Sequence, residues 1–274
     1  MRKLWVLGFA LFLVAAFTLP ASAIEHKFGG FTESMYAYYK NMDFSKNGIN
    51  QDYDAIRSRT RLNYTAVLTD KVRFVNEFEI DFVWGQQQNY GTIWGSAGDL
   101  GTDGLAFEVR YTHMDFDVAD FNFKIGAQRF VVHRGLIIGD DAAGAKVSYI
   151  GAKGLTPSLW YWRLNDGDNA SPGFTNRGSD MDHVQAMVDM KFGDLQLIPS
   201  VGYLFGNAGR YNTTTGGSQF AGAGPLKIYF AGLDANWKMG GLGVELTGIY
   251  EGGKMDDAAD LKIEAFALWG KASY

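Results

Sequence analysis

The 274-residue chain carries 25 basic and 30 acidic side chains, 35 glycines, 5 prolines and no cysteine, and 15% of its residues are aromatic. Without a basic surplus or a thiol, it lacks the composition of a nucleic-acid-binding protein and the means to form a disulfide framework. Abundant glycine and aromatic residues favour a protein of many strands and turns.

The first 23 residues have the pattern of a secretory signal peptide. Arg2 and Lys3 give a positive start, residues 4–19 are nearly all apolar, and Ala21-Ser22-Ala23 is a typical cleavage site. The alternative, a membrane anchor, is less favoured because the apolar run is short for a spanning helix. We therefore expect residues 1–23 to be removed on export and residues 24–274 to form the mature domain.

Residues 26–40 alternate in polarity, as do the two halves of residues 55–84. Such a period of two predicts strands with two different faces. Closing the hairpin 55–84 with Leu68 opposite Val72 pairs basic with acidic residues across the strands. One face then carries a charge ladder and the other is apolar and aromatic. The residues of the ladder are Arg57, Arg59, Arg61, Glu77, Glu79 and Asp81.

The same alternation continues to the end of the chain and predicts about twelve strands. On residues 105–113 it places His113 on the apolar, lipid-facing side, and on residues 261–274 it places Lys262 and Glu264 on the polar side. The phase of residues 155–164 stays open, and Pro157 suggests a bulge or an edge position there.

Short and long connections also alternate along the chain. Tight turns are expected at residues 69–71, 152–154, 193–194 and 239–241, with a short one near 117–120. Long polar loops are expected at residues 41–54, 85–104, 165–182 and 207–225. This segregation, with aromatic residues at strand ends, is typical of outer-membrane barrels, whose short turns are periplasmic; a secreted sandwich, the alternative, gives no reason for it. We expect an all-β, transmembrane, antiparallel up-and-down β-barrel of about 12 strands, or a larger barrel if the chain is truncated.

From Ile24 to Tyr274 the sequence resembles the Gram-negative outer-membrane porin class. The segment Arg57-Ser58-Arg59-Thr60-Arg61-Leu62, followed by Phe78-Glu79-Ile80-Asp81, resembles the first hairpin of single-chain porins of environmental bacteria, and the terminal aromatic Tyr274 fits the class. The resemblance implies a cell outer-membrane location, contact with outer-membrane lipid and lipopolysaccharide, and passive diffusion of small solutes or ions. Trimers are common in the class, so a homotrimer is one expectation.

Twelve strands of ordinary tilt give a backbone diameter of roughly 24 Å, wide enough for a channel for small molecules. Besides the ladder, the polar face supplies further charges that we expect to line this lumen, namely Glu108, Arg110, Lys124 and Lys146. Our hypothesis is that Arg57, Arg59 and Arg61 bias the lumen toward anions. The alternative is a ladder of neutralised pairs with a structural role.

The connection at residues 131–144 is a candidate constriction loop. Leu136, Ile137 and Ile138 make it too apolar for an ordinary external loop. Resemblance to porins whose third long loop folds into the lumen points to Arg134, Asp140 and Asp141 as residues of the constriction. The alternative is a strand extended above the membrane.

Two other function classes are alternatives: a barrel lipase or protease, and a structural anchor or adhesin that displays external loops. The histidines outside the signal, at positions 26, 113, 133 and 183, lie in no G-x-S-x-G or H-E-x-x-H motif. Acidic loop residues lack the spacing of a calcium loop. We therefore expect a porin, with no catalytic residue, no metal site and no cofactor.

Overall fold

The computed structural model describes residues 24–39, 53–85, 107–165, 180–207, 225–255 and 261–274. The expected signal peptide and most of the expected long loops lie outside these ranges. The described residues form the strands β1 Glu25–Tyr39, β2 Tyr53–Thr69, β3 Val72–Val83, β4 Glu108–Val118, β5 Phe121–Val132, β6 Ile138–Tyr149, β7 Leu155–Asn165, β8 Met181–Phe192, β9 Leu195–Asn207, β10 Pro225–Met239, β11 Leu242–Met255 and β12 Leu261–Ser273, and the short 3-10 helix η1 His133–Gly135. Among these residues, no helix has the length and apolar character needed to cross a membrane.

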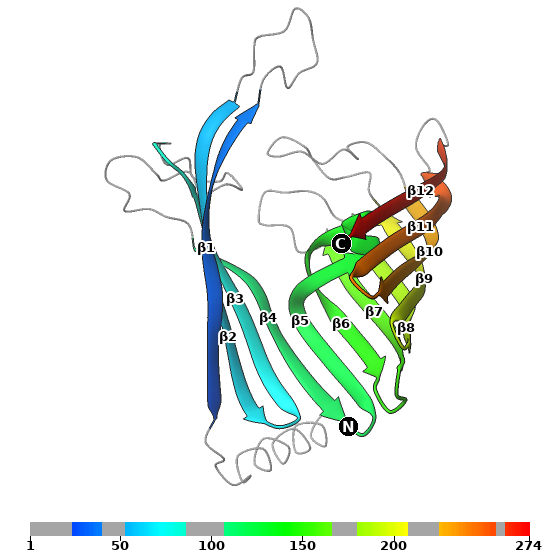
Figure 1. Ribbon diagram of the computed structural model, residues 1–274, viewed down its shortest axis with the longest axis horizontal. Helices are drawn as coiled ribbons and strands as arrows, with labels where there is room; N and C mark the ends of the chain where they lie inside the picture. Colours follow the sequence, from blue (N-terminus) through cyan, green and yellow to red (C-terminus); the bar gives the residue numbers. More distant parts are fainter. Residues whose placement is uncertain (1–23, 40–52, 86–106, 166–179, 208–224, 256–260) are drawn as a thin grey trace, which may run out of the picture.

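The twelve strands form one antiparallel sheet in which each strand pairs with the next along the chain (Figure 1). The predicted tight turns are confirmed, and Gly193 and Gly240 supply the positive φ of 60° that two of them need. Because all strands are antiparallel, these turns lie at one end of the sheet. Within the described residues β1 pairs only with β2 and β12 only with β11, so these two strands are the edges.

Each strand divides its side chains between an inner face, which carries most of the charges, and a largely apolar outer face. The outer face exposes large apolar residues over most of the sheet, among them Phe28, Leu62, Phe121, Leu159, Val201, Leu233, Leu246 and Phe266. A surface of this kind suits hydrocarbon, and the alternation matches that of membrane strands.

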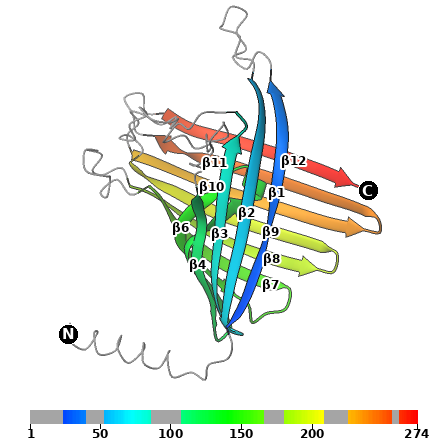
Figure 2. The same ribbon diagram turned by 90° about the vertical axis from the view of Figure 1, so that its left-hand side faces the viewer.

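The inner face is concave. Arg110 of β4 and Glu245 of β11, on opposite sides of the sheet, both contact the hairpin that joins β5 to β6. In Figures 1 and 2, β1–β4 stand on one side and β7–β12 on the other, crossing them at a steep angle. The hairpin therefore lies in the space that the sheet curls around.

The predicted register of the first long hairpin is confirmed over most of its length, with Arg61 opposite Glu79 and Arg59 opposite Asp81. The predicted Leu68–Val72 pair was wrong, because Thr69 pairs with Val72 and the register shifts at Leu68. A two-residue turn matches the right-handed twist of the flanking strands, and the extra residue is taken up as a bulge.

A second irregularity changes the face of His113. Glu77 pairs with Tyr111 but Phe78 pairs with Val109, so the strand changes phase at the bulged Arg110. His113 lies buried on the inner face, and its predicted lipid-facing position was wrong. Alternation alone could not show this, because one extra residue reverses every later side chain.

On β12 the side chains lie on another face than the sequence predicts, and on β7 the structure shows the face that the sequence left open. On β12, Lys262 and Glu264 lie on the outer face, not the polar inner face, since the neighbouring Ala265 pairs with the inward Glu251. Both charges sit at the start of the strand, with side chains 79% and 64% exposed. On β7, Trp160 and Trp162 point inward, opposite residues of the inner face of β6 and β8.

The β5–β6 hairpin leaves the wall of the sheet at a pair of glycines. Pairing of β5 with β4 ends at Ala127, and pairing of β6 with β7 ends at Ala143, so residues 128–142 pair only with each other. Gly126 lies directly opposite Gly144 at this point. A Cβ at Gly126 would collide with the backbone of β4, and one at Gly144 with Trp162. The two glycines let the strands bend inward.

Candidate functional site

The inner face of β2 and β3 carries the charge ladder that the sequence predicts. Arg59 holds Asp81 through two hydrogen bonds, Nε to Oδ1 at 2.9 Å and Nη2 to Oδ2 at 2.6 Å. Arg61, at the next inward position, donates one hydrogen bond from Nε to Oε2 of Glu79. These pairs are partly buried and lie against the wall, so each arginine is neutralised by a carboxylate.

Arg110 extends the ladder to β4 and on to the inward-bent hairpin. Its Nη1 lies 2.6 Å from Oε1 of Glu77, and its Nη2 lies 2.5 Å from Oδ2 of Asp141 on β6. The guanidinium therefore bridges the wall and the hairpin, and its side chain is only 13% exposed.

Nearer the short turns, a second charged group surrounds Asp115. Its carboxylate accepts from Arg73 at 3.1 Å and lies 3.5 Å from the ammonium of Lys124. Lys146, on the next strand, places its ammonium 4.3 Å from the centre of the Trp160 ring. This end of the inner face is the more basic one.

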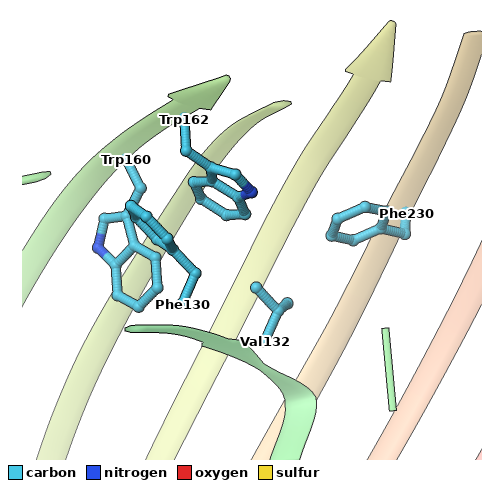
Figure 3. Packing of buried hydrophobic residues seen from close by; sticks show 5 residues of the cluster. All are labelled: Phe130, Val132, Trp160, Trp162 and Phe230. Atoms are coloured by element: carbon cyan, nitrogen blue, oxygen red, sulfur yellow. The ribbon is translucent and has the colours of Figure 1, made fainter. Parts of the chain in front are cut away.

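We call the distal part of the hairpin, residues 128–142, the inward hairpin. Two of its side chains pack with residues of the wall in a buried, mostly aromatic cluster that we call the aromatic base, made of Phe130, Val132, Trp160, Trp162 and Phe230. Phe130 stacks on Trp162 with ring centroids 4.3 Å apart, and Trp160 tilts against the same ring. Val132 and Phe230 complete the cluster, and all five side chains are buried (Figure 3). Full burial of one such side chain stabilises by about 1.5–3 kcal/mol, so the hairpin is held firmly on β7–β10.

The opposite side of the inward hairpin faces the charge ladder across an open cavity of about 510 Å³. We call this cavity the passage. Three arginines and five carboxylates line it, together with small apolar residues of β5 and β6. The charged residues are Arg59, Arg61, Arg110, Glu79, Asp81, Glu108, Asp140 and Asp141.

The three arginines of the passage are all paired, but two of its carboxylates are not. Among the described residues, Glu108 and Asp140 form no ion pair, and both are exposed. The carboxylate of Asp140 accepts only the neighbouring backbone N–H of Asp141, at 2.8 Å. The unpaired charge that lines the passage is therefore negative.

At the tip of the inward hairpin, Arg134 crosses to the far wall. Its guanidinium donates to Thr247 Oγ1 at 2.9 Å, to Glu245 Oε2 at 2.6 Å and to Asn236 Oδ1. It also lies over the ring of Trp269, 4.9 Å from the centroid. Arg134 is thus bound to β10, β11 and β12 and does not line the passage.

The neighbouring His133 fits between two polar groups of the same wall. Its Nε2 lies 2.8 Å from Ser200 Oγ, and its Nδ1 lies 3.3 Å from Asp234 Oδ2. Thr247 donates to the other oxygen of Asp234 at 2.6 Å. His133 and Ser200 are 3% and 7% exposed, so the group is enclosed between the hairpin and the wall.

A scan against protein-family models finds no match, and a search of curated proteins finds none. Solved structures do match. OmpT, an outer membrane protein of Vibrio cholerae in its trimer form, gives a TM-score of 0.53 at 13% identity, over 91% of this chain and 72% of that one. OccK8 (OprE) of Pseudomonas aeruginosa gives 0.51 at 14% identity, over 91% of this chain and 65% of that one. Both are outer-membrane β-barrel proteins.

The chain has the fold of outer-membrane β-barrels. This confirms the predicted fold class, with twelve antiparallel strands in up-and-down order. The matched structures extend beyond the part that this chain covers, so a larger barrel stays an open alternative.

In this barrel fold, all ten predicted lumen residues lie on the inner face. They are Arg57, Arg59, Arg61, Glu77, Glu79, Asp81, Glu108, Arg110, Lys124 and Lys146. Six of them, on β2 to β4, line the passage, namely Arg59, Arg61, Glu79, Asp81, Glu108 and Arg110. Arg57 lies further along, opposite Met35 and Val83, and the two lysines belong to the basic end. Their effect on solutes stays a prediction.

The predicted connection 131–144 is mostly strand in the barrel. β5 continues to Val132 and β6 begins at Ile138, so only η1 and two further residues join them. Asp140 and Asp141 line the passage, whereas Arg134, which sequence reasoning grouped with them, binds the far wall; their role as a constriction stays a prediction. Sequence reasoning missed the aromatic base and the partners Ser200 and Asn236, because no local pattern shows which wall a bent hairpin will reach.

Proposed function

We propose that this chain is an outer-membrane porin that lets small hydrophilic solutes diffuse through the passage. The observation that carries the proposal is the passage itself, a charged cavity on the concave face of a sheet whose outer face is apolar. Residues 1–23 direct export, lipid and lipopolysaccharide surround the barrel, and the matched OmpT trimer makes a homotrimer a reasonable assembly.

The solutes that this passage favours are cations. An ion crossing it meets arginines that carboxylates already neutralise, whereas Glu108 and Asp140 present unpaired negative charge. Charges that line a lumen tune its selectivity through their field. The arginines alone suggest a preference for anions. Because carboxylates neutralise them and two other carboxylates stay unpaired, we expect a preference for cations instead.

Conductance of the purified protein in a planar bilayer tests the proposal. We expect steady ohmic channels whose reversal potential under a salt gradient indicates preference for the cation. A folded protein that forms no channels contradicts the porin assignment, and channels that prefer the anion contradict the charge argument alone.

One arrangement bears on the enzyme alternative. Ser200, His133 and Asp234 follow each other in space as in a hydrolase triad. A nucleophile must reach its substrate, however, and Ser200 is covered by the inward hairpin. We therefore assign the trio to structure. We expect no labelling by a fluorophosphonate probe and no ester hydrolysis above that of a Ser200→Ala variant; labelling lost in that variant would favour the enzyme.

A further inference from the structure

The tip of the inward hairpin is strained as well as bound. His133 and Arg134 both have positive φ, 50° and 58°, a region that side-chain-bearing residues rarely adopt. Such a conformation persists only where surrounding contacts enforce it. The contacts that enforce it here come from β9 to β12, on the wall opposite the charge ladder.

The wall has space prepared for this tip. Gly232 of β10 lies beneath the imidazole of His133, and a Cβ at this position would collide with the ring. Ser200 Oγ lies within hydrogen-bond distance of Nε2 of that ring, the Asp234 carboxylate lies 3.3 Å from Nδ1, and Arg134 binds three further polar groups. The polar contacts sit at the tip, whereas the aromatic base holds the middle of the hairpin.

The inward hairpin also forms one side of the passage, through Asp140, Asp141 and Ala142. Asp140 pairs with Phe130, three residues before His133, so a motion of the tip that carries the start of β6 with it changes the cross-section that a solute meets. The paired glycines Gly126 and Gly144 provide the place where the hairpin bends.

We propose that His133 and Arg134 are positioning residues that clasp the hairpin tip to the far wall and hold the passage in a single conducting state. The proposal rests on the porin function proposed above. Without the clasp, the tip leaves β9–β12 and moves relative to the charge ladder, so the passage changes between several widths.

The test uses a substitution that removes the clasp without changing any charge. Gly232→Ala places a methyl group where the His133 ring lies, and Gly29→Ala is the matched control, because a Cβ there meets no atom within 4 Å on the same inner face. In single-channel recordings we expect one steady level for the unmodified protein and for Gly29→Ala. For Gly232→Ala we expect rapid fluctuation between levels, with the heat-modifiable migration of a folded barrel retained.

Arg134→Ala is the second variant, in case Gly232→Ala fails to fold, and the same fluctuation is expected. A single unchanged level in a folded Arg134→Ala protein overturns the proposal. Failure of both variants to fold overturns it too, because the contacts would then serve folding and not the position of the hairpin.

A labelling experiment separates the clasp from the porin function. The chain has no cysteine, so Val132→Cys introduces a single thiol at a position that is 1% exposed. We expect slow maleimide labelling in the otherwise unmodified protein and labelling at least several-fold faster when Arg134→Ala is added. Faster labelling in a protein that forms no channels would support the clasp while refuting the porin; equal rates would refute the clasp alone.

Discussion

At the scale of single residues, the decisive feature is which charges have partners. Arg59 and Asp81 satisfy each other through a bidentate pair, and a cross-strand pair in a wet lumen adds little net charge for a solute to sense. Glu108 and Asp140 lack such partners among the described residues. The sequence identifies all four side chains as charged, but only the structure shows which of them are neutralised by a partner and which are not.

Removal of the unpaired carboxylates should weaken the cation preference. We expect Glu108→Gln with Asp140→Asn to move the reversal potential toward zero, with a change in permeability ratio of at most about fivefold for each charge removed, because a unit charge in water acts with about 1 kcal/mol at contact distance. The matched control is Arg59→Gln with Asp81→Asn, which removes a neutral pair and should leave the reversal potential nearly unchanged. Equal shifts from both double variants would show that pairing does not decide selectivity.

At the scale of elements, the β5–β6 hairpin combines two roles that strands usually separate. The start of β5 and the end of β6 belong to the wall, and residues 128–142 bend inward at Gly126 and Gly144. The aromatic base then fills the side of the interior next to β7–β10, and the passage is left beside β2–β4. The hairpin is therefore both a core element and a wall of the passage.

Truncation of the aromatic base should destabilise the barrel. Phe130 is 1% exposed and stacks on Trp162, so Phe130→Ala should lower the free energy of unfolding by about 3–5 kcal/mol. Phe266→Ala is the control, because Phe266 is 82% exposed on the outer face of β12 and fills no cavity. Urea unfolding of the refolded protein in detergent measures both, and similar small losses would mean that the hairpin is not part of the core.

At the scale of the whole molecule, the two edges of the sheet set the requirement for closure. β1 and β12 are antiparallel to each other, since an even number of strands runs up and down. An unpaired edge in hydrocarbon leaves backbone groups without hydrogen bonds, which the membrane does not tolerate. We therefore expect these edges to pair in the membrane.

Cysteine pairs test this closure. Thr32→Cys on β1 is combined in turn with Phe266→Cys, Leu268→Cys and Gly270→Cys on β12, all on the outer face. We expect one of these combinations to form a disulfide within a single chain, since bridging requires the two Cα atoms to lie within about 7 Å. Cross-links that join only separate chains would indicate that the edges meet another copy instead.

The orientation of the barrel is a separate prediction. The short turns at Asp70 and Gly240 should face the periplasm, and the connections at residues 85–104 and 207–225 should lie outside. We expect Ser96→Cys and Ser218→Cys to react with an impermeant maleimide on intact cells, whereas Asp70→Cys and Gly240→Cys react only after the outer membrane is permeabilised. The reverse pattern would refute the orientation.

The sequence by itself determined the strand count, the turns, the two faces and the charge ladder, because these depend on neighbours in the chain and on pairing of adjacent strands. It misplaced His113, because a single bulged residue at Arg110 leaves no trace in the alternation. Only the tertiary structure decided that Arg134 meets Glu245, which lies 111 positions away. Curvature of the sheet and the bend at two glycines bring these residues together, and both depend on contacts between segments that are far apart in the chain.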